Sequence, residues 1–159
     1  MFLSNRNIEH WPGLVIDPML PERLQPASYD MGYSGYYIIQ GSKEHEGYGP
    51  LTIVPGSRAL VSTEERVEIP ADLVARVEGK STWARKGILV HLTAGFIDPG
   101  FQGHITLELY SVSHEPVVIP VHEPIAQLSF SRLLTPANPV YAGHYQSQGI
   151  WPKRAKVTV

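Results

Sequence analysis

The chain has 159 residues, of which 43% are hydrophobic and 18% are charged, so it can build one folded core and is not a charge-rich disordered polymer. Its 13 Lys and Arg nearly balance its 15 Asp and Glu, and this formal net charge of -2 disfavours broad binding to nucleic acid or to an anionic membrane. The absence of Cys excludes disulfides, thiolate metal ligands and a Cys nucleophile. Because the N-terminus carries charges and no apolar run could span a bilayer, we expect one cytoplasmic domain over residues 1–159.

The first predicted element is a helix over residues 5–11, because Ser4 is a good N-cap and Pro12-Gly13 ends the pattern. After it, 14 Gly and 14 Pro separate short runs rich in Val, Ile, Thr, Leu and Tyr, which is typical of an all-β barrel or sandwich. Residues 41–50 are polar and charged and predict a solvated loop. The predicted strands cover residues 36–39, 51–53, 58–63, 67–69, 73–78, 88–93, 103–110, 117–119, 125–134 and 156–159.

A basic, hydroxyl-rich segment follows the strand predicted at 73–78. In it, Lys80 and Arg85 flank the hydroxyl groups of Ser81 and Thr82. Backbone N–H groups, hydroxyls and a guanidinium in such a turn can form a phosphate cradle. A solvated turn whose hydroxyl caps a short helix explains the same residues, so both interpretations stay open at this point.

Two carboxylates stand out further along the chain. Asp98 precedes a Pro-Gly pair, which favours a tight turn that Asp98 itself would cap. In the strand predicted at 103–110, apolar residues occupy alternate positions, so Glu108 lies on the opposite face from them. Either Glu108 faces solvent on the outside of a sheet, or it is buried at a pocket or subunit interface with a raised pKa suited to a general base.

The His residues do not predict a metal centre. His91 and His104 fall on strands that could be neighbours, but no third ligand follows them at a regular spacing. The remaining His residues are in or beside predicted loops. We therefore expect no protein-bound zinc.

Together these segments resemble the dCTP deaminase branch of the trimeric dUTPase fold superfamily. Similar stretches occur in the family's order at residues 3–8, 25–30, 69–85, 93–108, 125–130 and 145–149, and the stretch from Thr93 to Glu108 is the most diagnostic. The resemblance implies an all-β fold: a dUTPase-like β-barrel or distorted jelly roll with one short N-terminal helix. It also implies a homotrimer with active sites between subunits, and a C-terminal lid or tail over residues 141–159.

The resemblance assigns catalytic positions to Glu108, Ser81, Arg85 and Ala94. Glu108 matches the general base that takes a proton from the water attacking C4 of cytosine. Ser81, Arg85 and the backbone near Ala94 match the groups that hold this water and balance its charge. Asp98 matches the contact to the sugar 3′-hydroxyl. The positions matched to substrate binding are Lys80, Ser81, Thr82, Trp83, Ala84, Arg85, Asp98, Thr106, Leu107, Glu108, Gln127, Tyr141 and Gln148.

Within this set, the resemblance implies that different positions contact different parts of the nucleotide. The polar positions within 80–85 match triphosphate contacts, helped by Mg²⁺ carried on the nucleotide. The backbone at 106–107 matches the part that reads the pyrimidine edge, and Gln127 matches a phosphate or sugar contact. Tyr141 and Gln148 belong to the closing C-terminal segment.

The expected activity is hydrolytic deamination of dCTP to dUTP and ammonia in thymidylate precursor synthesis, with dTTP as an inhibitor. His91-Leu92-Thr93 resembles the family members that stop at dUTP, whereas residues 94–101 resemble bifunctional members that continue to dUMP and pyrophosphate. The bifunctional reaction is therefore the alternative. A dUTPase without deaminase activity fits less well, because its Gly-rich C-terminal motif is missing after Tyr141 and Glu108 is retained. A non-catalytic β-sandwich binding module is the contrasting class.

One departure from the family concerns the lid. His144 stands where the family usually has a Lys just before Tyr145. A phosphate contact from this position would then depend on the protonation of an imidazole.

Overall fold

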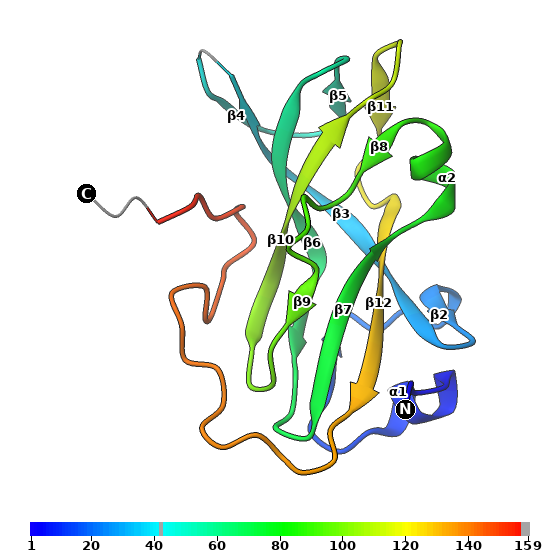
Figure 1. Cartoon of the computed structure of the whole chain (residues 1–159). Helices are drawn as coiled ribbons and strands as arrows, with labels where there is room; N and C mark the ends of the chain where they lie inside the picture. Colours follow the sequence, from blue (N-terminus) through cyan, green and yellow to red (C-terminus); the bar gives the residue numbers. More distant parts are fainter. Residues whose placement is uncertain (42, 157–159) are drawn as a thin grey trace.

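The computed structural model describes residues 1–41 and 43–156 (Figure 1). Its helical elements are α1 (Asn5–His10), the 3-10 helix η1 (Pro21–Arg23) and α2 (Ser81–Arg85). Its strands are β1 (Val15–Asp17), β2 (Leu24–Gln25), β3 (Ser28–Gln40), β4 (His45–Tyr48), β5 (Leu51–Ile53), β6 (Arg58–Glu68), β7 (Leu73–Gly79), β8 (Ile88–Leu89), β9 (Phe96–Ile97), β10 (Gln102–Ser111), β11 (Val117–Ile119) and β12 (Pro124–Arg132). The nearly all-β class that the sequence predicts is confirmed.

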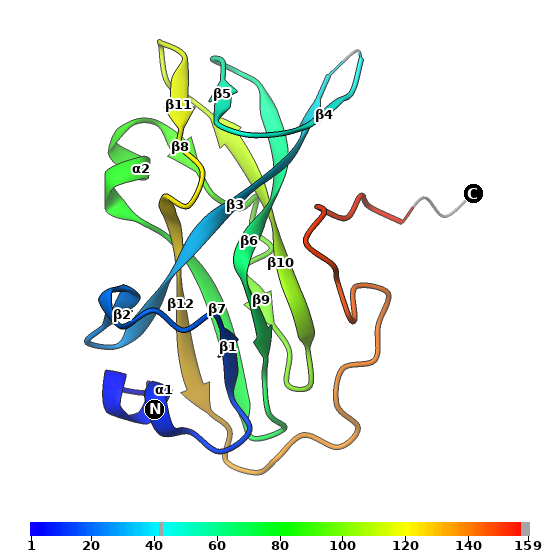
Figure 2. The same cartoon turned by 180° about the vertical axis from the view of Figure 1, so that it is seen from behind.

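The large sheet is antiparallel and has the strand order β8-β10-β6-β3-β12-β7-β9, while β5 and β11 form a small second sheet. The long strand β3 joins the two halves of the large sheet, because one part of it pairs with β12 and the other with β6. The sheet therefore curls, and Figures 1 and 2 show β9 between β7 and β10. This curl brings side chains from β7, β9 and β10 to one region of the molecule.

The core lies inside the curl and is built from alternate residues of its strands. On β10 the side chains of Ile105, Leu107 and Leu109 are buried, whereas Thr106 and Glu108 are only partly covered. This confirms the predicted alternation, which follows because successive side chains of a strand point to opposite faces. Glu108 is thereby kept out of the apolar core and presented on the other face of β10.

The loop predicted over residues 41–50 is wrong. It contains β4, which pairs with β3 in the register Tyr36↔Tyr48 to Ile39↔His45. The pairing satisfies backbone hydrogen bonds at the edge of the sheet whatever the polarity of the side chains, so composition alone does not reveal it. The strand predicted at 36–39 is accordingly the end of a longer one that begins at Ser28.

Other predicted boundaries also change. The strand predicted at 88–93 ends at Leu89, and Thr93 takes a φ of 67° that no regular strand contains. The strands predicted at 58–63 and 67–69 belong to the one strand β6, which ends at Glu68. The helix predicted at 5–11 ends one residue early, and the strand predicted at 125–134 ends two residues early. Lys156 is in no strand, and the rest of the strand predicted at 156–159 lies outside the described residues.

A buried ionic network fastens η1 to the centre of the sheet. Arg23 is 7% exposed and pairs with Glu65, which is fully buried on β6. Its guanidinium also donates to Glu64 at 2.8 Å and to the carbonyl of His122 at 2.9 Å, while Glu65 accepts from the backbone N–H of Gly32 at 2.9 Å. Burial raises the pKa of Glu65, and the hydrogen bond from Gly32 and the charge of Arg23 oppose that rise. The ionised form of Glu65 is therefore stabilised in the core by Arg23 and by the N–H of Gly32.

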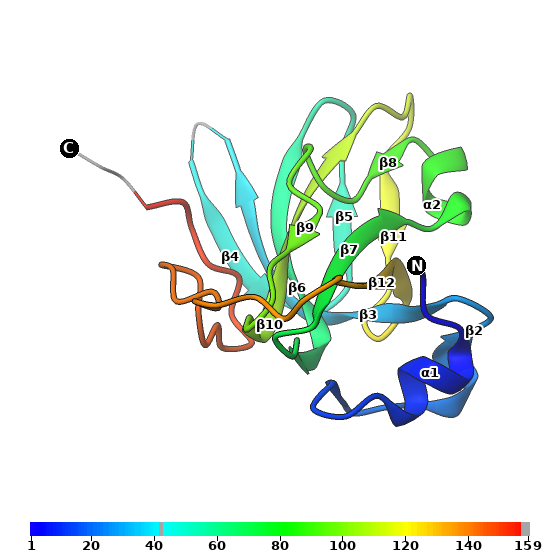
Figure 3. The same ribbon diagram turned by 60° about the horizontal axis from the view of Figure 1, so that its bottom comes forward.

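The segment after β12 leaves the sheet and returns beside it. It runs around the lower end of the sheet and rises next to β10 (Figures 1 and 3). An isolated bridge between Gly103 and Gln148 marks its contact with β10. No helix among residues 1–41 and 43–156 is long and apolar enough to cross a membrane.

Candidate active site

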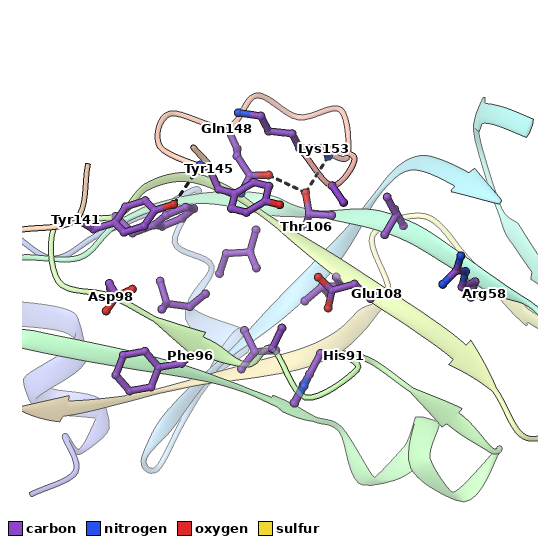
Figure 4. A pocket seen from close by; sticks show the side chains of 18 of the residues that line it. Arg58, His91, Phe96, Asp98, Thr106, Glu108, Tyr141, Tyr145, Gln148 and Lys153 are labelled. Atoms are coloured by element: carbon purple, nitrogen blue, oxygen red, sulfur yellow. Dashed lines mark hydrogen bonds between the residues drawn. The ribbon is translucent and has the colours of Figure 1, made fainter. Parts of the chain in front are cut away.

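A cavity of about 520 Å³ lies between the C-terminal segment and the strands β6, β7, β9 and β10. Figure 4 shows the C-terminal segment passing over one side of it and β10 forming the wall below. This volume is in the ordinary range for small-molecule sites. The predicted site residues that line the cavity are Ala94, Asp98, Thr106, Leu107, Glu108, Tyr141 and Gln148.

Glu108 occupies the wall of this cavity and not the open surface of a sheet. Burial raises the pKa of its carboxyl, and backbone hydrogen bonds at Glu108 and Leu92 and the nearby ring of His91 oppose part of the rise. A raised pKa makes the ionised carboxylate a stronger proton acceptor and makes the acid a usable donor near neutral pH. Of the two interpretations left open for Glu108, the structure supports the pocket carboxylate.

Asp98 lies in another part of the cavity, well separated from Glu108 in Figure 4. The turn that holds it is closed by the N–H of Phe101, which donates to the carbonyl of Asp98 at 3.2 Å. The Asp98 side chain is exposed. Tyr141 covers the turn, since its N–H donates to the carbonyl of Pro99 at 2.8 Å and its ring centroid lies 6.2 Å from that of Phe101. The cavity thus presents two carboxylates in different parts of its lining.

Thr106 connects β10 to the C-terminal segment. Its hydroxyl donates to Oε1 of Gln148 at 2.8 Å and accepts from the backbone N–H of Lys153 at 3.0 Å. The backbone N–H of His104 adds a bond to the carbonyl of Gln148 at 3.0 Å. Gln148 is thereby fixed from both its side chain and its backbone at the rim of the cavity.

Sequence reasoning missed several residues that the fold brings to the cavity, among them Gln40, Arg58, His91, Tyr145 and Lys153. The sequence predicts no site role for His91, yet its ring lies near Glu108 and its Nδ1 is buried without a hydrogen-bond partner in the described residues. The only sequence signal for it was its place beside the diagnostic stretch. Residues 1–41 and 43–156 contain no group of three or more His, Cys, Asp or Glu that could hold a metal ion.

The other predicted site residues do not reach this cavity within one chain. Lys80, Ser81, Thr82, Trp83, Ala84, Arg85 and Gln127 are all absent from its lining. Those in or beside α2 lie across the sheet from the C-terminal segment in Figures 1, 2 and 3. Ser81 and Arg85 are exposed there, so their side chains are free to meet a group from outside this chain.

The α2 segment is the short helix of one interpretation, but its N-cap is Lys80 and no side-chain hydroxyl caps it. It also presents hydroxyl and basic groups, so the phosphate cradle stays a prediction. Lys80 pairs with Asp30 of β3, and Gln127 accepts a hydrogen bond from Ser28 at 3.3 Å on the same part of the sheet. The side chain of Trp83 is 2% exposed in the core and donates to the carbonyl of Pro124 at 2.9 Å. The backbone N–H of Trp83 donates to the carbonyl of Lys80 at 3.0 Å, so Trp83 is a packing residue in this chain.

A family model described as dCTP deaminase-like matches residues 39–133. A protein of Bifidobacterium adolescentis named "dCTP deaminase, dUMP-forming" is 40% identical over an alignment that covers 99% of this chain and 95% of the relative. The chain belongs to the dCTP deaminase-like family.

Solved structures confirm the fold of this family member. A 2′-deoxycytidine 5′-triphosphate deaminase from Agrobacterium tumefaciens matches with a TM-score of 0.70 and 19% identity over 83% of this chain, although this chain spans only 48% of that one. The EIAV dUTPase matches with a TM-score of 0.58 and 17% identity over 83% of this chain and 97% of its own. The dUTPase-like architecture expected from the sequence is therefore correct.

The expectation that the reaction ends at dUTP is contradicted. The Bifidobacterium relative is named dUMP-forming, which agrees with the alternative reaction and not with the main one. The apolar residue Leu92 before Thr93 therefore does not indicate the product of the reaction. Leu92 is exposed and does not line the cavity, whereas Ala94, Phe96 and Asp98 of the bifunctional-like stretch all do.

Proposed function

We propose that the protein converts dCTP to dUMP in two hydrolytic steps, using the nucleotide as its magnesium complex. In the first step water replaces the amino group at C4 of cytosine, giving dUTP and ammonia. In the second, water attacks the α-phosphorus and releases pyrophosphate. The observation that carries the proposal is the pair of carboxylates, Glu108 and Asp98, held apart in one cavity of a chain whose relative is named dUMP-forming.

Glu108 is the general base of the first step. Its carboxylate takes a proton from the attacking water and returns protons to the nitrogen that leaves as ammonia. The partial burial of Glu108 supports this role, because a carboxyl of raised pKa both accepts and donates protons more readily near neutral pH. Thr106 and Leu107 precede it on β10, and in this proposal their backbone reads the pyrimidine edge.

Asp98 serves the sugar and the second step. Its carboxylate accepts a hydrogen bond from the 3′-hydroxyl of the deoxyribose and orients the water that attacks the α-phosphorus. Its exposed side chain at the cavity wall, remote from Glu108, supports this separate task. Tyr141 and Gln148 close over the nucleotide as part of the C-terminal lid, of which residues 141–156 are described.

The complete site is shared between subunits of a homotrimer. The polar groups of α2, among them Lys80, Ser81 and Arg85, bind the triphosphate and hold the attacking water beside the Glu108 of a neighbouring subunit. Supporting this, Ser81 and Arg85 are exposed and none of the three lines the cavity of its own chain. The Mg²⁺ on the phosphates neutralises their charge further. The nucleotide dTTP, which keeps the sugar and triphosphate, competes for the same site and inhibits.

Mixed trimers test the shared site. Glu108→Gln and Arg85→Ala chains should each be inactive alone. Random mixing should restore deamination to about a quarter of the wild-type level, because a site has intact Glu108 with a chance of about one half and intact Arg85 with a chance of about one half. In mixed trimers isolated with two affinity tags the level should be about a third, because one site of the three is intact. Activity that stays at the level of the single variants would place both groups in one subunit and contradict the shared site.

A product assay tests the reaction. The protein is incubated with dCTP and Mg²⁺, and ammonia, dUTP, dUMP and pyrophosphate are measured separately. We expect ammonia, dUMP and pyrophosphate in equal amounts, and supplied dTTP should slow their formation. Ammonia with dUTP as the stable product, or pyrophosphate from dUTP without any deamination of dCTP, would contradict the proposal.

A further inference from the structure

The C-terminal segment is tied down at two places, and the first is the wall of the cavity itself. The Thr106 hydroxyl donates to Gln148 and accepts from the backbone of Lys153, so one side chain uses both its donor and its acceptor on the same segment. Thr106 is two residues from Glu108 on β10 and points to the same face. The position of the segment is thereby coupled directly to the strand that carries the carboxylate.

The second place is the hairpin of β3 and β4, beyond the cavity. The ring centroid of Trp151 lies 4.6 Å from that of Tyr36, which in turn lies 4.8 Å from that of Tyr48. Three residues later, Arg154 donates to Glu44 at 2.9 Å and also pairs with Glu46. Extended backbone places residues two apart on one face, so the two carboxylates share one guanidinium that reduces their mutual repulsion.

The two places differ in strength. The contacts at Thr106 are partly buried, whereas Trp151 is 49% exposed and the ion pairs of Arg154 are solvent-accessible. Exposed ion pairs and aromatic contacts are individually weak, and salt weakens the ion pairs further. The hairpin contact is therefore the weaker of the two and the more sensitive to salt.

We infer that Trp151 and Arg154, with the Thr106 hydroxyl, are positioning residues for the two-step reaction. They hold the C-terminal segment across the cavity by docking it on the β3–β4 hairpin, and so retain the nucleotide between deamination and phosphate hydrolysis. The retention of dUTP as an intermediate rests on the proposed function, whereas the docking of the segment on the hairpin does not. A bound dUTP has two fates, hydrolysis or escape, and the docked segment reduces escape.

Charge reversal tests the docking. Arg154→Glu places three carboxylates together and should open the segment, and the triple change Arg154→Glu, Glu44→Arg and Glu46→Arg should close it again. Arg6→Glu is the matched control, because Arg6 is an exposed arginine on α1 at the far end of the molecule. Trp151→Ala and Thr106→Val test the aromatic and hydroxyl contacts separately. Unchanged circular dichroism spectra show that each variant is folded.

Two readouts separate docking from chemistry. Acrylamide quenching of tryptophan fluorescence, measured without nucleotide on Arg154→Glu, should rise because Trp151 loses its contact, and it should return in the triple variant. With dCTP as substrate, the KM of Arg154→Glu should be roughly five- to tenfold above that of the wild type, and free dUTP should appear beside dUMP. Its single-turnover rate of deamination should stay within about twofold of the wild type. Added salt should raise both the acrylamide quenching and the KM of the wild type, because it screens the ion pairs of Arg154.

Quenching and KM that match the wild type in Arg154→Glu would overturn the inference, as would a triple variant that stays as open as the single one. If wild-type protein releases dUTP and never dUMP, the proposed function fails. The quenching results and the KM for dCTP still decide the docking in that case, so the two failures are distinguishable.

Discussion

Replacing Glu108 by Gln removes the proton acceptor from the cavity and keeps nearly the same side-chain shape. General base catalysis by a positioned group contributes about 10²–10⁴-fold, so the kcat for ammonia release should fall by about that factor. The fold should not be weakened, because burial raises the pKa of Glu108 and thus disfavours its ionised form in the folded protein. A neutral amide avoids that cost, and the melting temperature should be equal to or above that of the wild type.

The assay compares two substrates with the same variant. Ammonia release from dCTP should be lost, whereas pyrophosphate release from supplied dUTP should stay within about threefold of wild type, since that step relies on Asp98. Retention of full deamination by Glu108→Gln would remove Glu108 as the base. Equal loss of both steps in a fully folded variant would refute the division between the two carboxylates.

Three further predictions concern the acid limb, the second carboxylate and the buried ionic network. As pH falls, deamination should be lost as Glu108 protonates, with a midpoint in a kcat/KM profile above the ordinary glutamate pKa, because burial raises that pKa; an ordinary midpoint contradicts this. Asp98→Asn should abolish pyrophosphate release from dUTP in a product assay, and undiminished release would exclude Asp98 from that step. Arg23→Met should lower the free energy of unfolding by about 3–5 kcal/mol in urea denaturation at pH 7, because Glu65 loses its buried partner. The deficit should shrink in acid as Glu65 protonates, and a loss independent of pH would point to packing instead.

The pattern of apolar residues along the sequence predicted those strands whose own residues form a buried face. The alternation along β10 identified the buried face and left Glu108 on the other, because a strand with one apolar face has a single register in which that face is buried. The hairpin strand β4 was missed, since its stability comes from pairing with β3 and not from its own charged and Gly-rich sequence. Residues 90–93 were assigned to a strand because apolar and β-branched residues there suggest one, but the chain turns at Thr93.

The candidate site was predictable only where a residue carries its own motif. Glu108, Asp98 and Ala94 were found through one contiguous stretch, and the structure places them along the same cavity. Arg58 begins β6 and Lys153 lies in the C-terminal segment, so they are far apart in the sequence and only the route of that segment beside the sheet brings them to one cavity. The separation of the α2 groups from the carboxylate of β10 within one chain agrees with the shared sites that the family resemblance implies, but no local pattern in the residues indicates it. Such separations depend on tertiary structure.

The most direct test of the central claim is the reaction of dCTP in water enriched in the heavy oxygen isotope. Two hydrolyses at C4 and at the α-phosphorus should leave two heavy oxygen atoms in dUMP, one on the base and one on the phosphate, as read by mass spectrometry of its fragments. Pyrophosphate should carry none. Labelled oxygen on the base alone, with dUTP as the species that carries it, would contradict a single protein performing both steps.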